Sequence, residues 1–227
     1  MNLTTEHRAL FCLLRAGLWE RKIDDFSPFP LTEAEWKNVH RMAVRQTVTG
    51  IVFRGLDYLP EDLLPNDMLM MRWVASVDSI EQRNQKMNAV LGSLQQAMAQ
   101  NDLHPVLLKG QGVAAFYEFP LLRECGDIDL YFSSEKEERK AAELMRQTGH
   151  LVERHADGSN NYSCAGIEIE HHTQLFDLYN PLLKGFLSKL IKKHGFSNRQ
   201  IGENLSVSVP SSLLNLLALN SHLLKHM

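Results

Sequence analysis

The chain has 227 residues, of which 44% are hydrophobic and 22% are charged, enough for one large globular domain or two small ones. Its 24 basic and 27 acidic residues nearly balance, so the composition gives no strong signal for nucleic-acid binding. The sequence has no run of about 18 apolar residues and no apolar signal-peptide core. The odd number of cysteines, without metal-ligand spacing, favours free thiols in a reducing compartment. We therefore expect a cytoplasmic protein that does not associate with membranes.

Residues 1–104 are predicted to form a helical N-terminal region. Apolar residues recur there at three-to-four spacing, as an amphipathic helix requires. Thr32 and Glu35 form a capping-box pattern that predicts the start of one helix. Asn66 is a predicted N-cap of a long helix with one apolar face, which the segment NDLHP at 101–105 ends.

Residues 105–179 change to a pattern of short strands with one helix, which predicts an α/β core. The predicted strands are VLL (106–108), DIDLYF (127–132), HLVER (150–154), NYSCA (161–165) and IEIEHH (167–172). Ser134 and Glu137 predict the start of the helix after the second strand. Residues 180–227 return to a helical pattern, interrupted by a candidate strand, LSVSV. The whole chain is therefore predicted to be an α+β protein with a small mixed sheet.

Two aspartates in the second predicted strand are the first candidate site residues. Asp127 and Asp129 are two positions apart, so in a strand their carboxylates project from one face about 6–7 Å apart. Two carboxylates on one face repel each other unless a cation lies between them. Mg²⁺ binds carboxylate and phosphate oxygens together, so this pair indicates metal-bound phosphate chemistry.

The turn after the first predicted strand, Lys109-Gly110-Gln111-Gly112, suits the other half of that chemistry. Glycines at a strand-to-helix junction allow the backbone to approach a phosphate, and Lys109 adds a positive charge. We expect the turn to hold the anion and the aspartates to hold the metal.

The order of these motifs resembles a known family. The segments LLKG, Y-x-x-P-L-x-R and GDIDL are similar to those of the uncharacterised bacterial nucleotidyltransferase-like family, within the DNA polymerase beta-type nucleotidyltransferase superfamily. The resemblance implies a small mixed-sheet nucleotidyltransferase core at 105–179. It also implies that the helical segment 180–227 is the start of a longer helical domain.

The resemblance further implies a role for each matching residue. Asp127 and Asp129 match the metal-binding pair, and Glu170 in GIEIEHHTQL matches the third carboxylate, with His172 as the family's histidine. Glu168 shares the strand face of Glu170 and stays open as an alternative third carboxylate. The residues expected to contact the nucleotide are Lys109, Gly110, Gln111 and Arg123.

The activity implied is transfer of a nucleoside monophosphate from an NTP to an acceptor hydroxyl, with Mg²⁺ or Mn²⁺ as cofactor and pyrophosphate as product. The acceptor stays open among a small molecule, a protein and an RNA end. Two other classes also stay open. One is a non-catalytic nucleotide-binding or regulatory protein on the same fold, and the other is a glycosyltransferase that uses D-x-D to hold a nucleotide diphosphate.

Overall fold

A computed structural model of the chain describes residues 3–155, 158–176, 178, 180–202 and 204–225. The chain packs into two compact units. The first unit consists of residues 1–85 and 117–124, and the second of residues 86–116 and 125–227. The predicted division at residues 104 and 179 stays a prediction. Among the described residues, no helix is long and apolar enough to cross a membrane.

The first unit is helical, as predicted. Its elements are α1 (Thr5–Trp19), α2 (Glu33–Arg45), α3 (Thr49–Leu56), η1 (Glu61–Leu63), the first half of α4 (Asp67–Ala99) and η2 (Pro120–Leu122). The Thr32–Glu35 capping box is present at the start of α2, and Asn66 accepts a hydrogen bond from the backbone N–H of Leu69 at the start of α4. Trp36 and Trp73 are buried in the core that these helices share.

The second unit is built on a mixed five-stranded sheet with the order β1-β2-β5-β4-β3. The strands are β1 (Val106–Leu108), β2 (Ile128–Tyr131), β3 (Glu153–Arg154), β4 (Asn160–Cys164) and β5 (Ile167–His172). The central pair β2 and β5 is parallel, and the other neighbours are antiparallel. The α+β class and the mixed sheet are thus confirmed.

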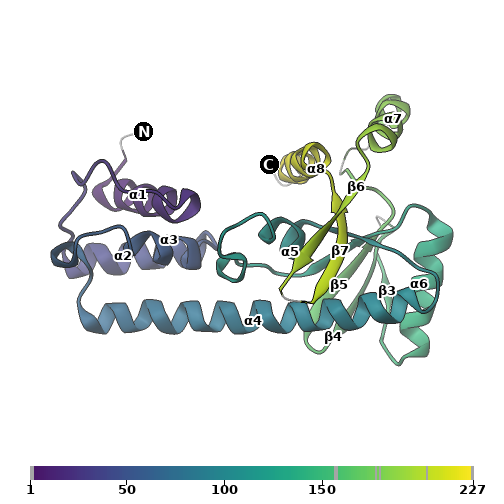
Figure 1. The fold of residues 1–227 in the computed structure, drawn as a ribbon, viewed down its shortest axis with the longest axis horizontal. Coiled ribbons are helices and arrows are strands. Elements are labelled where there is room, and N and C mark those ends of the chain that lie inside the picture. The colour runs from purple at the N-terminus through teal and green to yellow at the C-terminus, as the bar shows by residue number, and fades with distance from the viewer. Residues whose placement is uncertain (1–2, 156–157, 177, 179, 203, 226–227) are drawn as a thin grey trace. The chain divides into compact units, whose positions relative to one another are not determined.

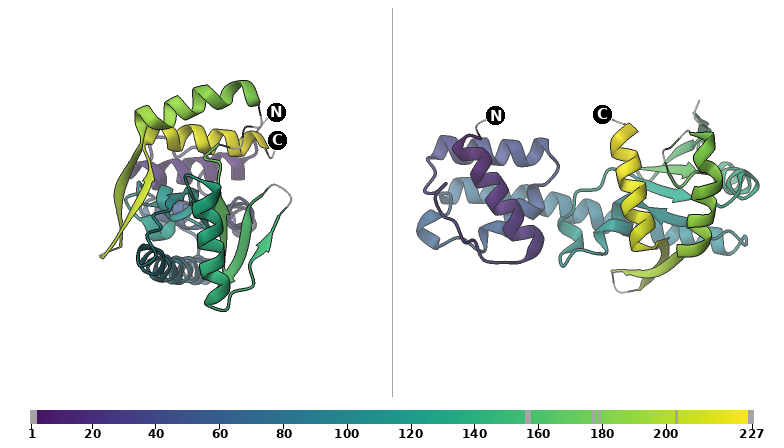
Figure 2. Two further views of the ribbon diagram at one scale, coloured as in Figure 1. Left: turned by 90° about the vertical axis from the view of Figure 1, so that its right-hand side faces the viewer. Right: turned by 90° about the horizontal axis from the view of Figure 1, so that it is seen from above.

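Helices cover both faces of this sheet (Figures 1 and 2). One face packs against the second half of α4 and against α6 (Glu135–Gln147) through a core that includes Leu107, Ile128 and Ile169. The opposite face packs against α7 (Lys184–His194) and α8 (Ser212–Lys225) around Leu108 and Tyr131. Alternate residues of each strand therefore face different helices, as the two-residue period of a strand requires.

The sequence pattern missed one strand. β6 (Phe196–Ile201) pairs with β7 (Leu205–Pro210) in a hairpin that packs beside β1. Only β7 was predicted as a strand, because the FSNRQI segment has no apolar alternation and five of its six residues are exposed. Pairing with the apolar β7 makes it a strand.

The segment 117–124 interrupts the second unit in sequence and packs within the first unit. The side-chain amide of Asn84 donates hydrogen bonds to the carbonyls of Leu121 and Arg123, at 2.7 and 2.8 Å. The Glu124 carboxylate accepts one from the backbone N–H of Thr49 at 2.8 Å. The motif Y-x-x-P-L-x-R is therefore anchored to the helices of the first unit.

Candidate functional site

The site is centred on Asp129, in the middle of the sheet. In β2, Asp129 is the register partner of Leu108 on the antiparallel side and of Glu170 on the parallel side. The side chains of Asp129 and Glu170 are therefore neighbours on one face of the sheet. Asp129 is only 1% exposed, and a carboxylate so deeply buried needs compensating charge.

Two cationic side chains supply that charge. The Nε2–H of His172 donates to Asp129 Oδ1 at 2.7 Å, and Lys109 Nζ donates to the same oxygen at 3.0 Å. The other oxygen, Asp129 Oδ2, is buried and accepts no hydrogen bond from any residue that the structure describes. One oxygen of the Asp129 carboxylate is thus satisfied, and the other is a buried acceptor that no described residue uses.

Glu170 is held from two directions. Asn161, its register partner in β4, donates a hydrogen bond from its amide to Glu170 Oε1 at 3.0 Å. His172 Nε2 lies 3.3 Å from Glu170 Oε2. Sequence reasoning placed Asn161 only as a strand residue, because an asparagine within a predicted strand carries no signal of its own. Its proximity to Glu170 follows from strand register alone.

Asp127 lies directly before β2 and is partly buried. Burial, followed by the negative charges of Asp129 and Glu170, raises the pKa of the Asp127 carboxyl. Lys109 opposes this effect only partly. Asp127 is therefore the member of the carboxylate group whose negative charge the protein compensates least.

The other members of the site have pKa values shifted in favour of their charged forms. Burial by itself would raise the pKa of Asp129, but the hydrogen bond from His172 and the charge of Lys109 outweigh it and lower that pKa. The hydrogen bond with His172 also lowers the pKa of Glu170. For His172, burial would lower the pKa, but hydrogen bonds to Asp129 and Glu170 raise it to about 9. In the metal-free protein at neutral pH, His172 is therefore a cation between two anions.

The predicted glycine turn has the backbone conformation that favours glycine. Gly110 has a φ of 26°, and a Cβ there would lie 3.2 Å from the carbonyl oxygen of Asp127. Lys109 has a φ of 45°, which is uncommon for a residue with a side chain. The turn thus lies beside the start of β2. The side chain of Gln111 is buried, with its amide 3.4 Å from Met87 Sδ, so a contact between Gln111 and a nucleotide would involve its backbone.

The sequence also predicted Arg123 and Glu168 as site residues. Arg123 belongs to the first unit, where the carbonyl of Glu124 accepts from its guanidinium at 3.5 Å. Glu168 is exposed and is the register partner of Ser163, near the start of β5. The cluster of possible metal ligands consists of Asp129, Glu170 and His172, whose ligand atoms all lie within 4.8 Å of one another. The structure therefore favours Glu170 over Glu168 as the partner of Asp129.

A second polar network supports β5 from its opposite face. His171 is completely buried, and its Nε2 lies 3.2 Å from the hydroxyl of Tyr162. Its Nδ1 lies 3.6 Å from a carboxylate oxygen of Glu138 on α6. Adjacent residues of a strand face opposite sides of the sheet, so this network links α6 to β5 and does not join the carboxylate cluster.

The donor atoms of the cluster fit a divalent cation. Asp129 offers a buried oxygen to which no described residue donates, and Glu170 offers a partly buried carboxylate beside it. Hard cations such as Mg²⁺ and Mn²⁺ prefer carboxylate oxygens, whereas protonated His172 holds the two carboxylates through Nε2 and offers no lone pair from that atom. A bound cation would in addition offset the mutual repulsion of the carboxylates.

A family model described as uncharacterised nucleotidyltransferase matches residues 32–227, which include every residue of the site described above. No curated protein and no solved structure matches the chain.

Proposed function

Because the chain belongs to the uncharacterised nucleotidyltransferase family, we propose that it transfers a nucleoside monophosphate from an NTP to an acceptor hydroxyl and releases pyrophosphate. The family membership confirms the resemblance seen in LLKG and GDIDL. The observation that carries the proposal is the register pairing of buried Asp129 with partly buried Glu170, where Asp129 Oδ2 accepts no hydrogen bond from the described residues.

Asp127, Asp129 and Glu170 would hold Mg²⁺ or Mn²⁺. When bound, the cation would supply positive charge to the phosphate oxygens, which carry the developing charge in phosphoryl-type transfer. His172 connects Asp129 with Glu170 through a single Nε2 atom, and Asn161 fixes the other oxygen of Glu170. His172 and Asn161 would thereby keep the Asp129 and Glu170 carboxylates in place although their negative charges repel each other.

Lys109 and Gly110 would contact the phosphates. Lys109 follows β1, and its ammonium group donates a hydrogen bond to the Asp129 carboxylate. A phosphate bound beside that carboxylate would therefore meet a positive charge that is already in position. Gly110 would permit a phosphate to approach the backbone closely beside Asp127. Its positive φ, and the short distance that an added Cβ would have to the Asp127 carbonyl oxygen, support this role. Arg123 and the backbone of Gln111 are proposed as further contacts on the strength of the family resemblance.

Glu170 would either bind the cation on the nucleophile side or accept the proton of the acceptor hydroxyl. Its lowered pKa keeps it ionised at neutral pH, which suits a cation ligand and makes it a weak base. Asp127, with its raised pKa, is the more basic of the two carboxylates.

One observation supports a second candidate function. Lys109 and His172 both pair with Asp129, so this carboxylate is partly neutralised without a cation. A non-catalytic nucleotide-binding or regulatory protein on the same fold would have the same contacts. It would bind an NTP without releasing pyrophosphate.

A screen of the four NTPs with Mg²⁺ or Mn²⁺ tests both candidates, scored by thermal stability, pyrophosphate release and self-labelling. A ligand at about 100 times its Kd stabilises the folded protein by about 2.7 kcal/mol, or roughly 5–10 °C for a chain of this size. Lys109→Ala should lose most of this shift, whereas Lys193→Ala, an exposed lysine of the same unit, should keep it. No shift with any NTP at millimolar concentration would refute nucleotide binding. A shift without pyrophosphate release or self-labelling would favour the non-catalytic candidate.

A further inference from the structure

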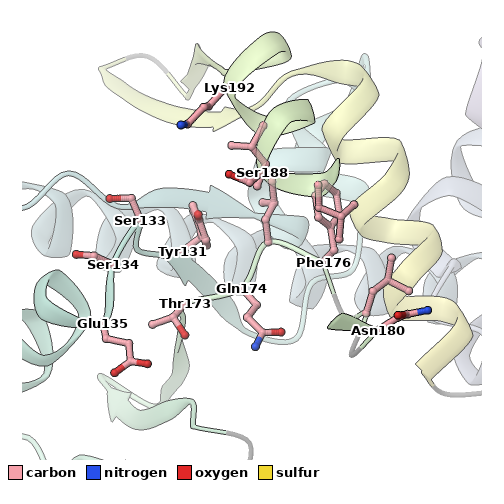
Figure 3. Close-up of a pocket in the computed structure, with 14 residues that line it drawn as sticks. Tyr131, Ser133, Ser134, Glu135, Thr173, Gln174, Phe176, Asn180, Ser188 and Lys192 are labelled. Atoms are coloured by element: carbon pink, nitrogen blue, oxygen red, sulfur yellow. The ribbon is translucent and has the colours of Figure 1, made fainter. Parts of the chain in front are cut away.

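A pocket of about 610 Å³ lies at the carboxyl ends of the parallel strands β2 and β5 (Figure 3). Its wall includes Tyr131 at the end of β2, Ser133 before α6, Thr173 after β5 and Ser188 on α7. This volume is in the range of small-molecule sites, which is about 300–1,000 Å³. All the lining residues belong to the second unit, which also holds the carboxylate cluster.

The pocket and the carboxylates share one face of the sheet. Tyr131 lies two residues beyond Asp129 in the same strand, so both side chains project to the same side. Tyr131 packs in the same core as Leu108, the register partner of Asp129, whereas Ile128 and Leu130 pack in the core on the other face. Residues two apart in a strand are separated by about 6–7 Å, so Tyr131 connects the pocket wall with the carboxylate cluster, whose members are not among the described lining residues.

The pocket and the glycine turn lie on opposite sides of Asp129. Because β1 is antiparallel to β2, the chain after Leu108 runs towards the start of β2, and Gly110 approaches the carbonyl of Asp127. Tyr131 and Ser133 follow Asp129 in the other direction. The order along the face is therefore glycine turn, carboxylates, pocket.

In-line transfer requires this order. The acceptor oxygen forms a bond to the α-phosphorus while the bond from that phosphorus to the bridging oxygen of pyrophosphate breaks on the opposite side. The bonding electrons leave with pyrophosphate, and the proton of the acceptor hydroxyl passes to the carboxylate of Glu170 or to solvent. If the glycine turn holds the phosphates that leave, the acceptor must approach from the side of the pocket.

The lining indicates the chemical class of the acceptor. The lining combines hydroxyl side chains, in Tyr131, Ser133, Ser134, Thr173 and Ser188, with an equal number of apolar side chains. Gln174 and Asn180 add side-chain amides, and apolar residues including Phe176 line the remainder. Among the lining residues that the structure describes, the charged ones are Glu135 and Lys192, and their charges are opposite. The described part of this wall offers neutral hydrogen-bonding groups beside apolar surface and carries no net charge, which fits an uncharged molecule rich in hydroxyl groups better than a polyphosphate or an RNA backbone.

We propose that this pocket binds the acceptor, and that the acceptor is a small, uncharged, polyhydroxylated molecule of the sugar class. The proposal rests on the proposed function, because it assigns the acceptor of the same reaction. The hydroxyl that reacts is the one directed from the pocket towards Glu170.

Ser188→Trp tests the pocket directly. Ser188 is exposed on α7, so a tryptophan there would fill the pocket without disturbing the core. Lys189→Trp is the matched control, because Lys189 is exposed on the same helix and does not line the pocket. The probes are methyl glucoside, methyl galactoside and inositol at millimolar concentration, and saturation-transfer NMR measures their binding. The nucleotide-induced thermal shift is measured in parallel.

We expect the neutral probes to bind the wild-type protein and Lys189→Trp, and to bind Ser188→Trp about tenfold more weakly or less. The nucleotide-induced shift should be the same in all three proteins. Absence of probe binding to the wild type, or equal binding to Ser188→Trp, would overturn the proposal. Loss of the nucleotide shift in Ser188→Trp would assign the pocket to the nucleoside instead. Preference for glucose 6-phosphate, abolished by Lys192→Ala, would refute an uncharged acceptor. If no protein shows a nucleotide shift but the probes bind as expected, the proposed function fails while the pocket stands.

Discussion

Asp127 and Asp129, two residues apart, should respond in opposite ways to the loss of their charge. Asp127→Asn removes a carboxylate whose pKa is raised by burial and by the charges of Asp129 and Glu170. Two unit charges about 6.5 Å apart repel each other by about 2.5 kcal/mol at an effective dielectric constant of 20. Lys109 offsets part of this repulsion. We therefore expect Asp127→Asn to stabilise the metal-free protein by about 1 kcal/mol, which corresponds to roughly 2–4 °C in Tm.

Asp129→Asn should destabilise the same protein. Asp129 is buried and accepts hydrogen bonds from Lys109 and His172, and hydrogen bonds to charged groups contribute about 1.5–3 kcal/mol each. The side chains of Lys109 and His172 are each about one-fifth exposed, so hydrogen bonds to water would replace part of the interaction that they lose with Asp129. We expect a loss of about 2–3 kcal/mol. Both variants should also lose the stabilisation by Mg²⁺ and NTP.

The stability of each variant is measured by calorimetry in a chelating buffer at pH 7. Tryptophan fluorescence would report the unfolding of the first unit, whereas the aspartates belong to the second unit. The three tryptophans, Trp19, Trp36 and Trp73, all belong to the first unit. Because the folded-state pKa of Asp127 is raised above 3.8, the folded protein binds that proton more tightly than the unfolded chain. The advantage of Asp127→Asn should therefore shrink as the pH falls towards 3.8. Destabilisation by Asp127→Asn at pH 7 would refute the view that its charge is uncompensated.

Glu170→Gln should reduce pyrophosphate release by about a hundredfold or more. Glu168→Gln should have a small effect, because Glu168 is exposed and lies outside the cluster. A larger effect of Glu168→Gln than of Glu170→Gln would exchange the roles of the two residues. The pKa of His172 is raised from 6.5 to about 9, so its contribution to metal-free stability is complete below pH 6.5 and is lost as the pH rises through about 9. Urea denaturation should therefore show wild type and His172→Gln converging at high pH, and a gap that stays constant with pH would contradict this. Gly110→Ala should cost about 1–2 kcal/mol because of its positive φ, whereas Gly185→Ala, within α7 and in open space, should be neutral or stabilising in the same denaturation experiment.

Local interactions are what the sequence predicts well in this chain. The Thr32–Glu35 capping box and the Asn66 N-cap depend on residues three positions apart, and both are present. The strands β1, β2 and β5 are short apolar or alternating runs bounded by turns, and their period alone assigned Asp129 and Glu170 to definite strand faces. The glycine turn was recognisable because a strand-to-helix junction of this kind needs a residue that tolerates positive φ, as Gly110 does.

Pairing and packing between segments escaped sequence reasoning. β6 is a strand only because β7 pairs with it, and the segment 117–124 packs in the first unit because Asn84 and Thr49 bind its backbone and its terminal carboxylate. The β6 segment has no apolar alternation of its own although its partner β7 follows it directly, and the partners of the segment 117–124 lie far away in the sequence, so neither contact leaves a local pattern.

The candidate site divides in the same way. The spacing in GDIDL was sufficient to nominate Asp127 and Asp129, the family resemblance of IEIEHH nominated Glu170 and His172, and the two-residue period of a strand added Glu168 on the same face. Only the parallel register of β2 with β5 pairs Asp129 with Glu170 and leaves Glu168 outside the cluster. Register depends on how whole strands pack against the helices on both faces of the sheet, and a shift by one residue would exchange those faces. Tertiary structure alone therefore brings Lys109 and His172 to the same oxygen of Asp129.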